Sequence, residues 1–440
     1  MTLSKMFFAA SALAVSAASA SAQPRVNPRP PADAEAPPPG ANVLVGYIQQ
    51  AYGVSKRQAE ERVQIQGEIA ALLENPAFSR DENFAGVVVE NEPVYQVFLL
   101  YDDNDAKSEL LKLVPPTLRK YVKIRKTRFS KSGRRSGEQT IQRALKAANV
   151  SAVVDYDQRG DVFVIQAPGA DAGTIRGLLP AEYQDTFRLD TSPFPQPEQY
   201  TTGTAGRAAY AGYVLNPSCT LAFAVTYTYG GVAGRQGILS AGHCFEPADP
   251  DKSLDWADGA RTVFVNPVWR LSQNSIDVAF LETTNMTTGY WINYDNPPTS
   301  TGGYANQVGG FATPQGWLRA KNFIRSTASW VGMSVCKQGR MTALTCGEVT
   351  STSYPYTYFG DGRFVRVSNS RQQELSAPGD SGGPWFTSTV VSTSTDVSVL
   401  GIHITGAGVG TTAYALYMPI ERVFALPAGG PTDIKLFLTP

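Results

Sequence analysis

The feature that most constrains the fold of this chain is a change in composition near residue 200. Charged side chains make up 46 of the first 200 residues but only 30 of the remaining 240. The second part replaces charge with Gly, Thr, Ser, Tyr and Val, a composition typical of strands joined by tight turns. Because 440 residues are long enough for about three domains of roughly 150 residues, we expect an α+β part followed by an all-β part.

The N-terminus has the three-part pattern of a secretory signal. Lys5 precedes an apolar and small-residue run that ends in Ala20-Ser21-Ala22. This run is shorter than the ~20 residues needed to span a bilayer, and the alternative is a disordered tail with a chance apolar stretch. We predict a signal peptide over residues 1–22, cleaved after Ala22, and an extended proline-rich linker over residues 23–42.

Charge and cysteine content limit the partners and the compartment. The chain has 38 basic and 38 acidic side chains, so it lacks the basic excess of a nucleic-acid-binding protein, and no segment is typical of a membrane span. All four cysteines lie in the second part. An even number of cysteines on an exported chain favours disulfides, and the sequence alone permits three pairings.

The first part, residues 43–195, contains a helix-then-hairpin pattern twice, which predicts two related small units. Ser55 and Gln58 have capping-box spacing before the first helical pattern, which ends at Pro76. The other predicted elements are strands at Phe84–Glu90 and Val94–Tyr101, a helix at Ser136–Asn149, and strands at Ala152–Tyr156 and Val162–Gln166.

A basic segment lies between the two copies. Arg119 to Arg135 carries nine Lys or Arg in seventeen residues and no acid. It could be a docking surface or a cleavage target. We favour a solvated loop or helix face, because nothing nearby specifies a partner.

Three segments of the second part offer a general base, an orienting acid and a nucleophile. His243 follows an apolar strand and a turn of small residues, which leaves room for a partner and a substrate. Asp277 precedes the apolar run Val278 to Leu281, where a buried carboxylate needs a hydrogen-bonding partner such as an imidazolium. Ser381 lies in a Gly-Asp-Ser-Gly-Gly sequence. A serine hydroxyl becomes nucleophilic when an oriented base takes its proton, so the trio predicts nucleophilic catalysis.

The glycines around Ser381 predict a site that binds a negatively charged oxygen. They let the backbone approach a reacting group closely, with the N–H groups of Gly379 and Ser381 pointing into one small space. Such a pair of donors is what an oxyanion hole requires. We therefore predict Gly379 and Ser381 as the oxyanion-binding residues.

These motifs resemble those of the chymotrypsin-fold serine proteases. The resemblance rests on Gly-His-Cys244, Ile276-Asp-Val-Ala279 and Gly379-Asp-Ser-Gly-Gly-Pro384, and it covers residues 205–425. The segment Val335 to Val349 further resembles the cysteine-containing hairpin of bacterial streptogrisins and α-lytic protease. Those enzymes are secreted behind a signal and a large prosegment, and the two α+β units of this chain resemble their pro-regions.

The resemblance implies two antiparallel six-stranded β-barrels within residues 196–440, with the active site between them. His243 would be the general base and then acid, Asp277 would orient it, and Ser381 would form the acyl-enzyme. Asp380 pairs with a new N-terminal amine in animal relatives, and we leave its partner here open. The implied disulfides are Cys219–Cys244 and Cys336–Cys346.

The predicted specificity pocket departs from the family pattern. Its far wall, Gly-x-x-Ser-Gly-Gly in the family, reads Gly401-Ile-His-Ile-Thr-Gly406 here. Ile404 replaces a serine whose hydroxyl normally touches the catalytic Asp, so we expect a weaker orienting network. Thr405 replaces a glycine and narrows the wall, and Ala377 replaces a cysteine, so we expect no pocket disulfide.

The P1 preference has two readings. His403 matches a histidine of glutamate-selective relatives and favours an acidic P1, unless it packs behind the wall for structural reasons. Leu375, near the pocket floor, favours a medium apolar or aromatic P1, and no acid aligns there to select a basic one. The predicted substrate-binding residues are Leu375, Ser376, His403, Ile404, Thr405 and Gly406.

Together these features predict a secreted serine endopeptidase, extracellular or periplasmic, that acts as a monomer on polypeptide substrates. The first part would be an intramolecular chaperone and inhibitor, because non-local strand pairing folds slowly without a template, and self-cleavage near residue 200 would release the enzyme. The alternatives are a catalytically silent binding protein on a protease scaffold and an esterase. No metal, phosphate-loop or nucleotide motif is present, so we expect no metal site and no cofactor.

Overall fold

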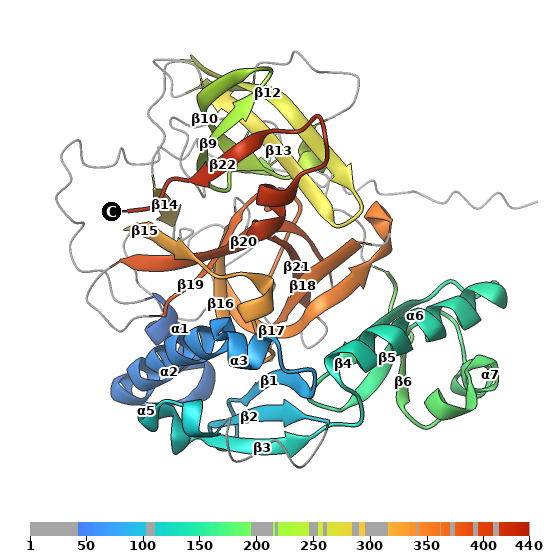
Figure 1. Ribbon diagram of the computed structural model, residues 1–440. Coiled ribbons are helices and arrows are strands. Elements are labelled where there is room, and N and C mark those ends of the chain that lie inside the picture. Colours follow the sequence, from blue (N-terminus) through green and yellow to red (C-terminus); the bar gives the residue numbers. More distant parts are fainter. Residues whose placement is uncertain are drawn as a thin grey trace, which may run out of the picture.

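The computed structural model describes thirteen stretches of the chain. They are residues 43–102, 111–194, 214–215, 219–245, 254–257, 262–283, 290–294, 316–339, 342–360, 362–369, 375–389, 395–407 and 413–439. The predicted signal peptide and linker lie outside the described residues, as does the joint between the two parts, predicted at Thr191 to Gly206, except for residues 191–194. The described residues form an α+β part, 43–194, that packs against a mostly β part, 214–439 (Figure 1).

The first α+β unit contains the predicted helix and hairpin. Ser55 and Gln58 form the predicted capping box at the start of α2, and the helix ends before Pro76. The hairpin is followed by a third strand that pairs with β2 in parallel. The elements are α1 (Val43–Tyr52), α2 (Lys56–Glu74), α3 (Pro76–Ser79), β1 (Phe84–Glu90), β2 (Gln96–Tyr101), α5 (Pro116–Arg119) and β3 (Val122–Lys126).

The second unit repeats this arrangement. Its hairpin is again extended by a third, parallel strand, so both units have the order helix, hairpin, helix, strand. The elements are α6 (Lys131–Ala147), β4 (Val153–Asp157), β5 (Val162–Gln166), α7 (Ala172–Leu178), η1 (Ala181–Tyr183) and β6 (Phe187–Asp190). The helix-then-hairpin prediction is confirmed for both copies, and the basic segment forms β3 and the start of α6.

The first sheet of the β part has six strands in the order β11-β12-β13-β10-β9-β22. All of its pairings among the described residues are antiparallel, and the C-terminal strand returns to pair with β9. The strands are β9 (Ala224–Tyr229), β10 (Val232–Ser240), β11 (Leu254–Ala257), β12 (Thr262–Gln273), β13 (Ile276–Thr283) and β22 (Thr432–Leu436).

The second sheet has eight strands in the order β14-β15-β20-β19-β16-β17-β18-β21. Pairing of β20 with β21 joins six of these strands into a ring, and β15 adds to β20 in parallel. The strands are β14 (Trp291–Tyr294), β15 (Gly316–Phe323), β16 (Ser334–Gly339), β17 (Ala343–Tyr356), β18 (Gly362–Ser368), β19 (Pro384–Thr387), β20 (Asp396–Ala407) and β21 (Tyr414–Pro419). The described residues of this part are mostly β-sheet with a few short helices, whereas two closed six-stranded barrels stay a prediction.

The α+β part docks on the β part through apolar packing together with polar and backbone contacts. β4 lies against β17, and α1 lies against β16 (Figure 1). The Val89 N–H donates to the Val331 carbonyl at 2.8 Å, and Arg159 donates to Glu348 Oε2 at 2.6 Å. Farther along the interface, Tyr354 Oη donates to Gln166 Oε1 at 2.6 Å. The Tyr354–Gln166 pair is buried between the two parts, whereas the Arg159–Glu348 pair is exposed.

Two acids of the second α+β unit become buried at this interface. Burial raises the pKa of Glu138 to about 7, although the guanidinium of Arg363 opposes the shift from 2.6 Å. Burial also raises the pKa of Asp155 to about 6, against the hydrogen bond donated by Ser351. Both carboxyls therefore bind protons more readily in the docked structure than in the unfolded chain.

We expect the unfolding temperature to fall as the pH rises from about 5 to about 7. An acid whose pKa is raised by folding binds more protons when folded. The free energy of unfolding therefore decreases as the pH rises from the pKa of the unfolded state to the pKa of the folded state. The pKa rises on folding from 4.5 to about 7 for Glu138 and from 3.8 to about 6 for Asp155. Glu138→Gln combined with Asp155→Asn should flatten this fall, as measured by thermal unfolding across pH.

The matched control is Glu74→Gln, which changes an exposed acid at the end of α2. It should leave the pH dependence of the unfolding temperature as it is in the unmodified chain. An unchanged slope in the double variant would contradict the assignment of this pH dependence to Glu138 and Asp155.

Candidate active site

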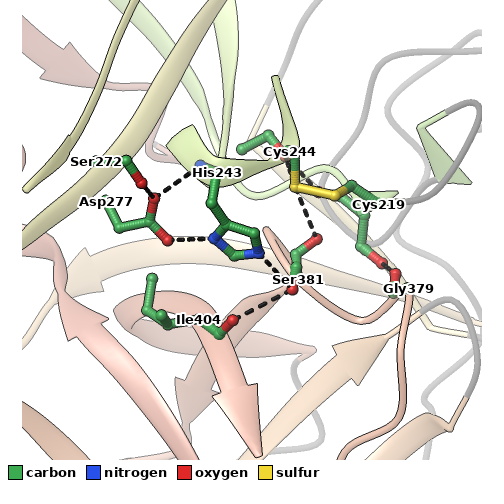
Figure 2. Close-up of a disulfide and its surroundings, with 10 residues drawn as sticks. Cys219, His243, Cys244, Ser272, Asp277, Gly379, Ser381 and Ile404 are labelled. Atoms are coloured by element: carbon green, nitrogen blue, oxygen red, sulfur yellow. Dashed lines mark hydrogen bonds and ion pairs between the residues drawn. A yellow bond between two sulfur atoms is a disulfide. The ribbon is translucent and has the colours of Figure 1, made fainter. Parts of the chain in front are cut away.

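The structure brings together three side chains that lie far apart in the sequence (Figure 2). His243 belongs to the short helix η2 (Gly242–Cys244) after β10, Asp277 to β13, and Ser381 to the turn before β19. His243 Nδ1 lies 2.6 Å from Asp277 Oδ2, and His243 Nε2 lies 2.9 Å from Ser381 Oγ. The three residues predicted from the sequence therefore form one continuous hydrogen-bonded chain.

Strand pairing explains why His243 meets Asp277. Ser240 at the end of β10 is the cross-strand partner of Ala279 on β13, so the residues that follow β10 lie beside the start of β13. Gly242 makes the close approach possible, because a Cβ there would lie 2.3 Å from the Leu271 carbonyl oxygen and 3.0 Å from Asp277 Oδ1. Any larger residue at position 242 would push the histidine away from the carboxylate.

The Asp277 carboxylate is completely buried and surrounded by donors. Its Oδ1 accepts the His243 backbone N–H at 2.8 Å and the hydroxyl of Ser272, while its Oδ2 faces His243 Nδ1. A buried carboxylate needs such donors to remain ionised. Since Asp277 accepts at Nδ1–H, the lone pair of Nε2 faces Ser381, which is the tautomer a general base requires.

The imidazole is also held from the second sheet. The ring of Phe359, in η4 (Thr357–Phe359), stacks on the His243 ring with centroids 6.0 Å apart. Phe359 is itself buried. The orientation of His243 therefore depends on both sheets.

The turn that carries Ser381 is fixed to the short strand β8 (Cys219–Thr220). The Thr220 N–H donates to the Ser381 carbonyl at 2.7 Å, and Thr220 Oγ1 donates to the Gly379 carbonyl at 2.9 Å. Gly379 has φ of 109°, a conformation that favours glycine. A Cβ on Gly382 would lie 2.2 Å from the Thr220 carbonyl oxygen. These contacts position the backbone of residues 379–382, and the oxyanion role of Gly379 and Ser381 stays a prediction.

Both disulfides implied by the resemblance are present. Cys219–Cys244 joins β8, which holds the serine turn, to η2, which carries the histidine. Cys336–Cys346 links the cross-strand partners of the β16–β17 hairpin. The first disulfide therefore ties together the two segments that must stay aligned.

Asp380, whose partner the sequence left open, pairs with Lys337 on β16. The Lys337 Nζ lies 2.6 Å from Asp380 Oδ2, and both side chains are fully buried. Thr342 donates to the same carboxylate from its hydroxyl at 2.5 Å and from its backbone N–H at 3.2 Å. Burial alone raises the pKa of Asp380, but Lys337 outweighs it and holds this pKa below its ordinary value.

His403 is buried and contacts side chains on both of its ring nitrogens. The Trp385 indole N–H lies 3.2 Å from Nδ1, and Ser376 Oγ lies 2.6 Å from Nε2. An indole nitrogen only donates, so Nδ1 must be the acceptor and the proton of a neutral imidazole must be on Nε2. Both ring nitrogens of His403 are therefore engaged by side chains of this chain, Trp385 at Nδ1 and Ser376 at Nε2.

Of the other predicted pocket residues, Ile404 contacts the serine directly. The Ile404 carbonyl is 3.2 Å from Ser381 Oγ, and the side chains of Ile404 and Thr405 are fully buried. Gly406 packs directly on Ser376, because a Cβ there would lie 2.3 Å from Ser376 Cβ. Leu375 lies in the core cluster with Trp385. The pocket assignments stay predictions.

Sequence reasoning missed four residues at this site: Ser272, Phe359, Thr220 and Lys337. The only one with a local signal is Ser272, because a two-residue turn at Asn274-Ser275 places it opposite Asp277. The other three come from distant segments. Their roles depend on how the two sheets pack.

The described residues contain no group of three or more His, Cys, Asp or Glu that could hold a metal ion. Among the same residues, no helix is both long enough and apolar enough to cross a bilayer.

No protein-family model matches the chain, and no curated protein matches it. Similar solved structures include Thermobifida fusca protease A, with 19% identity and a TM-score of 0.34 over 53% of this chain and 100% of that one. A Nocardiopsis protease has 18% identity and a TM-score of 0.35 over 52% and 99%. The Cellulomonas bogoriensis chymotrypsin has 20% identity and a TM-score of 0.33 over 53% and 100%.

Proposed function

We propose that this protein is a serine endopeptidase that cleaves peptide bonds through an acyl-enzyme on Ser381. The observation that carries the proposal is the hydrogen-bonded chain from Ser381 through His243 to the buried Asp277. A hydroxyl, an imidazole and a carboxylate in this order are the elements of nucleophilic acyl transfer, whatever fold holds them. The contacts from two sheets support the proposal, because they preorganise the chain before substrate binds.

In the acylation step, His243 Nε2 takes the Ser381 proton while Oγ attacks the carbonyl carbon of the scissile bond. Asp277 stabilises the imidazolium that forms and keeps Nε2 directed at the serine. The N–H groups of Gly379 and Ser381 would stabilise the negative oxygen of the tetrahedral intermediate. His243 then gives its proton to the leaving amine, and the same groups activate water to hydrolyse the ester.

The surroundings of His403 support an uncharged P1 side chain over an acidic one. An imidazole whose two ring nitrogens already contact Trp385 and Ser376 is less available to bind a P1 carboxylate. The contact between Gly406 and Ser376 further favours a P1 side chain of moderate size. Cleavage of a peptide library would separate a medium apolar or aromatic P1 from an acidic one.

The first part of the chain, residues 43–195, is proposed to be a prosegment. Its docking on β17 and β16 supports a role in guiding the second sheet, since β17, with 14 residues, is the longest strand described in that sheet. The two disulfides suit an oxidising compartment. We therefore propose that the chain is exported as a monomeric zymogen and cleaves itself near residue 200.

A fluorophosphonate probe tests the catalytic proposal on the purified protein. The probe should label the wild-type chain at Ser381 and leave both Ser381→Ala and heat-denatured wild-type protein unlabelled. The same Ser381→Ala precursor should stay uncut near residue 200, and its cleavage in purified form would disprove self-processing. If correctly folded wild-type protein in both precursor and cut form is never labelled, the protein is a silent binding protein on this scaffold.

A further inference from the structure

One hydroxyl on the Asp277 carboxylate comes from an unexpected strand. Ser272, on β12, donates to Asp277 Oδ1 (Figure 2). At the position where the resemblance predicts a serine hydroxyl, this chain has Ile404, whose backbone carbonyl faces Ser381 Oγ instead. We propose that Ser272 is a positioning residue that orients Asp277 and so takes over the task of the missing hydroxyl. The proposal rests on the proposed function of the triad.

The register of the β12–β13 hairpin places Ser272 beside Asp277. The two residues are cross-strand partners, and Gln273 and Ile276 pair next to the turn. The turn itself is Asn274-Ser275, with φ of 53° and 65° at two non-glycine residues. Positive φ at both central positions is the conformation of a tight two-residue hairpin turn, which fixes the register of the strands. The side chains at 272 and 277 therefore lie on the same face of the hairpin.

Contacts from the second sheet hold this turn in place. The Asn274 N–H donates to the Phe359 carbonyl at 2.5 Å, and the Arg363 N–H donates to Ser275 Oγ at 3.0 Å. Arg422 also donates to the Ser275 carbonyl, at 2.8 Å. A slip by one residue would break these bonds and move the hydroxyl at 272 to the opposite face. The hydroxyl is thus positioned by packing between the two sheets.

Ser272 and the His243 backbone share the orientation of the carboxylate. Both donate to Oδ1, whereas Oδ2 faces the imidazole, so rotation of Asp277 about its χ2 angle would break both bonds at Oδ1. Ser272 is exposed, whereas its cross-strand partner Asp277 is fully buried. An exposed serine tolerates substitution without a cavity in the core, which makes the contribution of its hydroxyl measurable.

Removal of the hydroxyl has two expected consequences. A hydrogen bond to a charged group is strong enough to change a rate about tenfold or more, so Ser272→Ala should lower kcat by about tenfold with little change in KM. A carboxylate that loses a donor also presents more negative charge to His243, which favours the imidazolium. The pKa of His243 should therefore rise, and the acid limb of the kcat/KM profile should move to higher pH by the same amount.

The chain contains only two histidines, which makes a direct measurement practical. Protein labelled with ¹⁵N at histidine would give ring-nitrogen signals from two imidazoles, and His243→Ala identifies which belong to His243. Titration by NMR should give a higher pKa for His243 in Ser272→Ala than in wild type. Ser272→Thr keeps a hydroxyl on the same strand and should restore both the pKa and kcat. Gln273→Ala, a change at the neighbouring exposed position on the opposite face, should alter neither.

Rates are compared per active site titrated with the fluorophosphonate probe. An unchanged His243 pKa together with an unchanged kcat in Ser272→Ala would overturn the proposal. It would also be overturned if fewer active sites of Ser272→Ala reacted with the probe while the reactive ones kept the wild-type kcat. Failure of Ser272→Thr to restore either quantity would also overturn it. The NMR titration needs no turnover, so it decides the role of Ser272 even if the wild-type protein proves inactive and the proposed function fails.

Discussion

Replacing Ser381 with alanine should lower kcat by about 10⁶-fold, because it removes the hydroxyl that hydrogen-bonds to His243 and attacks the substrate in the proposed mechanism. His243→Ala should cost about as much, since the serine remains protonated and weakly nucleophilic without its base. The two changes should not add, because both remove the same hydrogen-bonded chain. Steady-state rates on a peptide substrate, with the double variant compared to each single one, measure this directly.

The control for this series is Ser329→Ala, a change in the second part outside the triad. It should retain the wild-type kcat, and circular dichroism should give the same fold for all variants. Rates that fall further in the double variant than in either single one would indicate that Ser381 and His243 act separately, and the acyl-enzyme mechanism would then be wrong.

Lys337→Met should produce the largest loss of stability, about 3–5 kcal/mol, because it leaves the Asp380 carboxylate buried without a cation. The loss should also remove titratable active sites, since Asp380 directly precedes Ser381 and its carboxylate anchors the turn. Adding Asp380→Asn should recover part of the stability by removing the second charge. Urea unfolding measures the free energy, and the fluorophosphonate probe counts the active sites.

The pH dependence of this pair follows from the lowered pKa of Asp380. An acid with a pKa lowered by folding stabilises the protein above its unfolded value of 3.8, and that contribution is lost as the pH falls through the folded value. The difference between wild type and Lys337→Met should therefore persist at neutral pH and shrink in strong acid.

Lys321→Met is the matched control, because Lys321 is an exposed lysine 3.8 Å from an acid, Asp396. Exposed ion pairs contribute about 1 kcal/mol or less, so this variant should unfold close to the wild-type urea concentration. If Lys337→Met behaves like Lys321→Met, the buried pair does not anchor the serine turn.

The α+β part illustrates how far local patterns extend. The capping box at Ser55 and the hairpin strands follow from short-range spacing, and the structure contains them. The third strand of each unit was not predicted. β3 lies within the basic segment and β6 has only four residues, so neither has a clear alternation. Both strands exist because they pair in parallel with a neighbour that is distant in sequence.

The β part shows the same limit at the level of sheets. Its strand-rich composition predicted an all-β fold, and its described residues are mostly β-sheet. The parallel pairing of β15 with β20 and the addition of β14 outside the ring were not predicted. Strand order depends on contacts between residues far apart in sequence, which periodicity within one strand does not encode.

For the candidate site, the sequence by itself determined which residues have the required chemistry and which glycines let the backbone approach them. His243, Asp277 and Ser381 were identified from their local surroundings alone, and the structure brings them within hydrogen-bonding distance. Only the tertiary structure decided which groups support them. Ser272 supplies the hydroxyl that the resemblance predicts from a serine at position 404, where this chain has Ile404. Lys337 is the partner of Asp380. The physical reason is that hydrogen bonds and ion pairs act over a few ångströms in space, and folding decides which distant segments come that close.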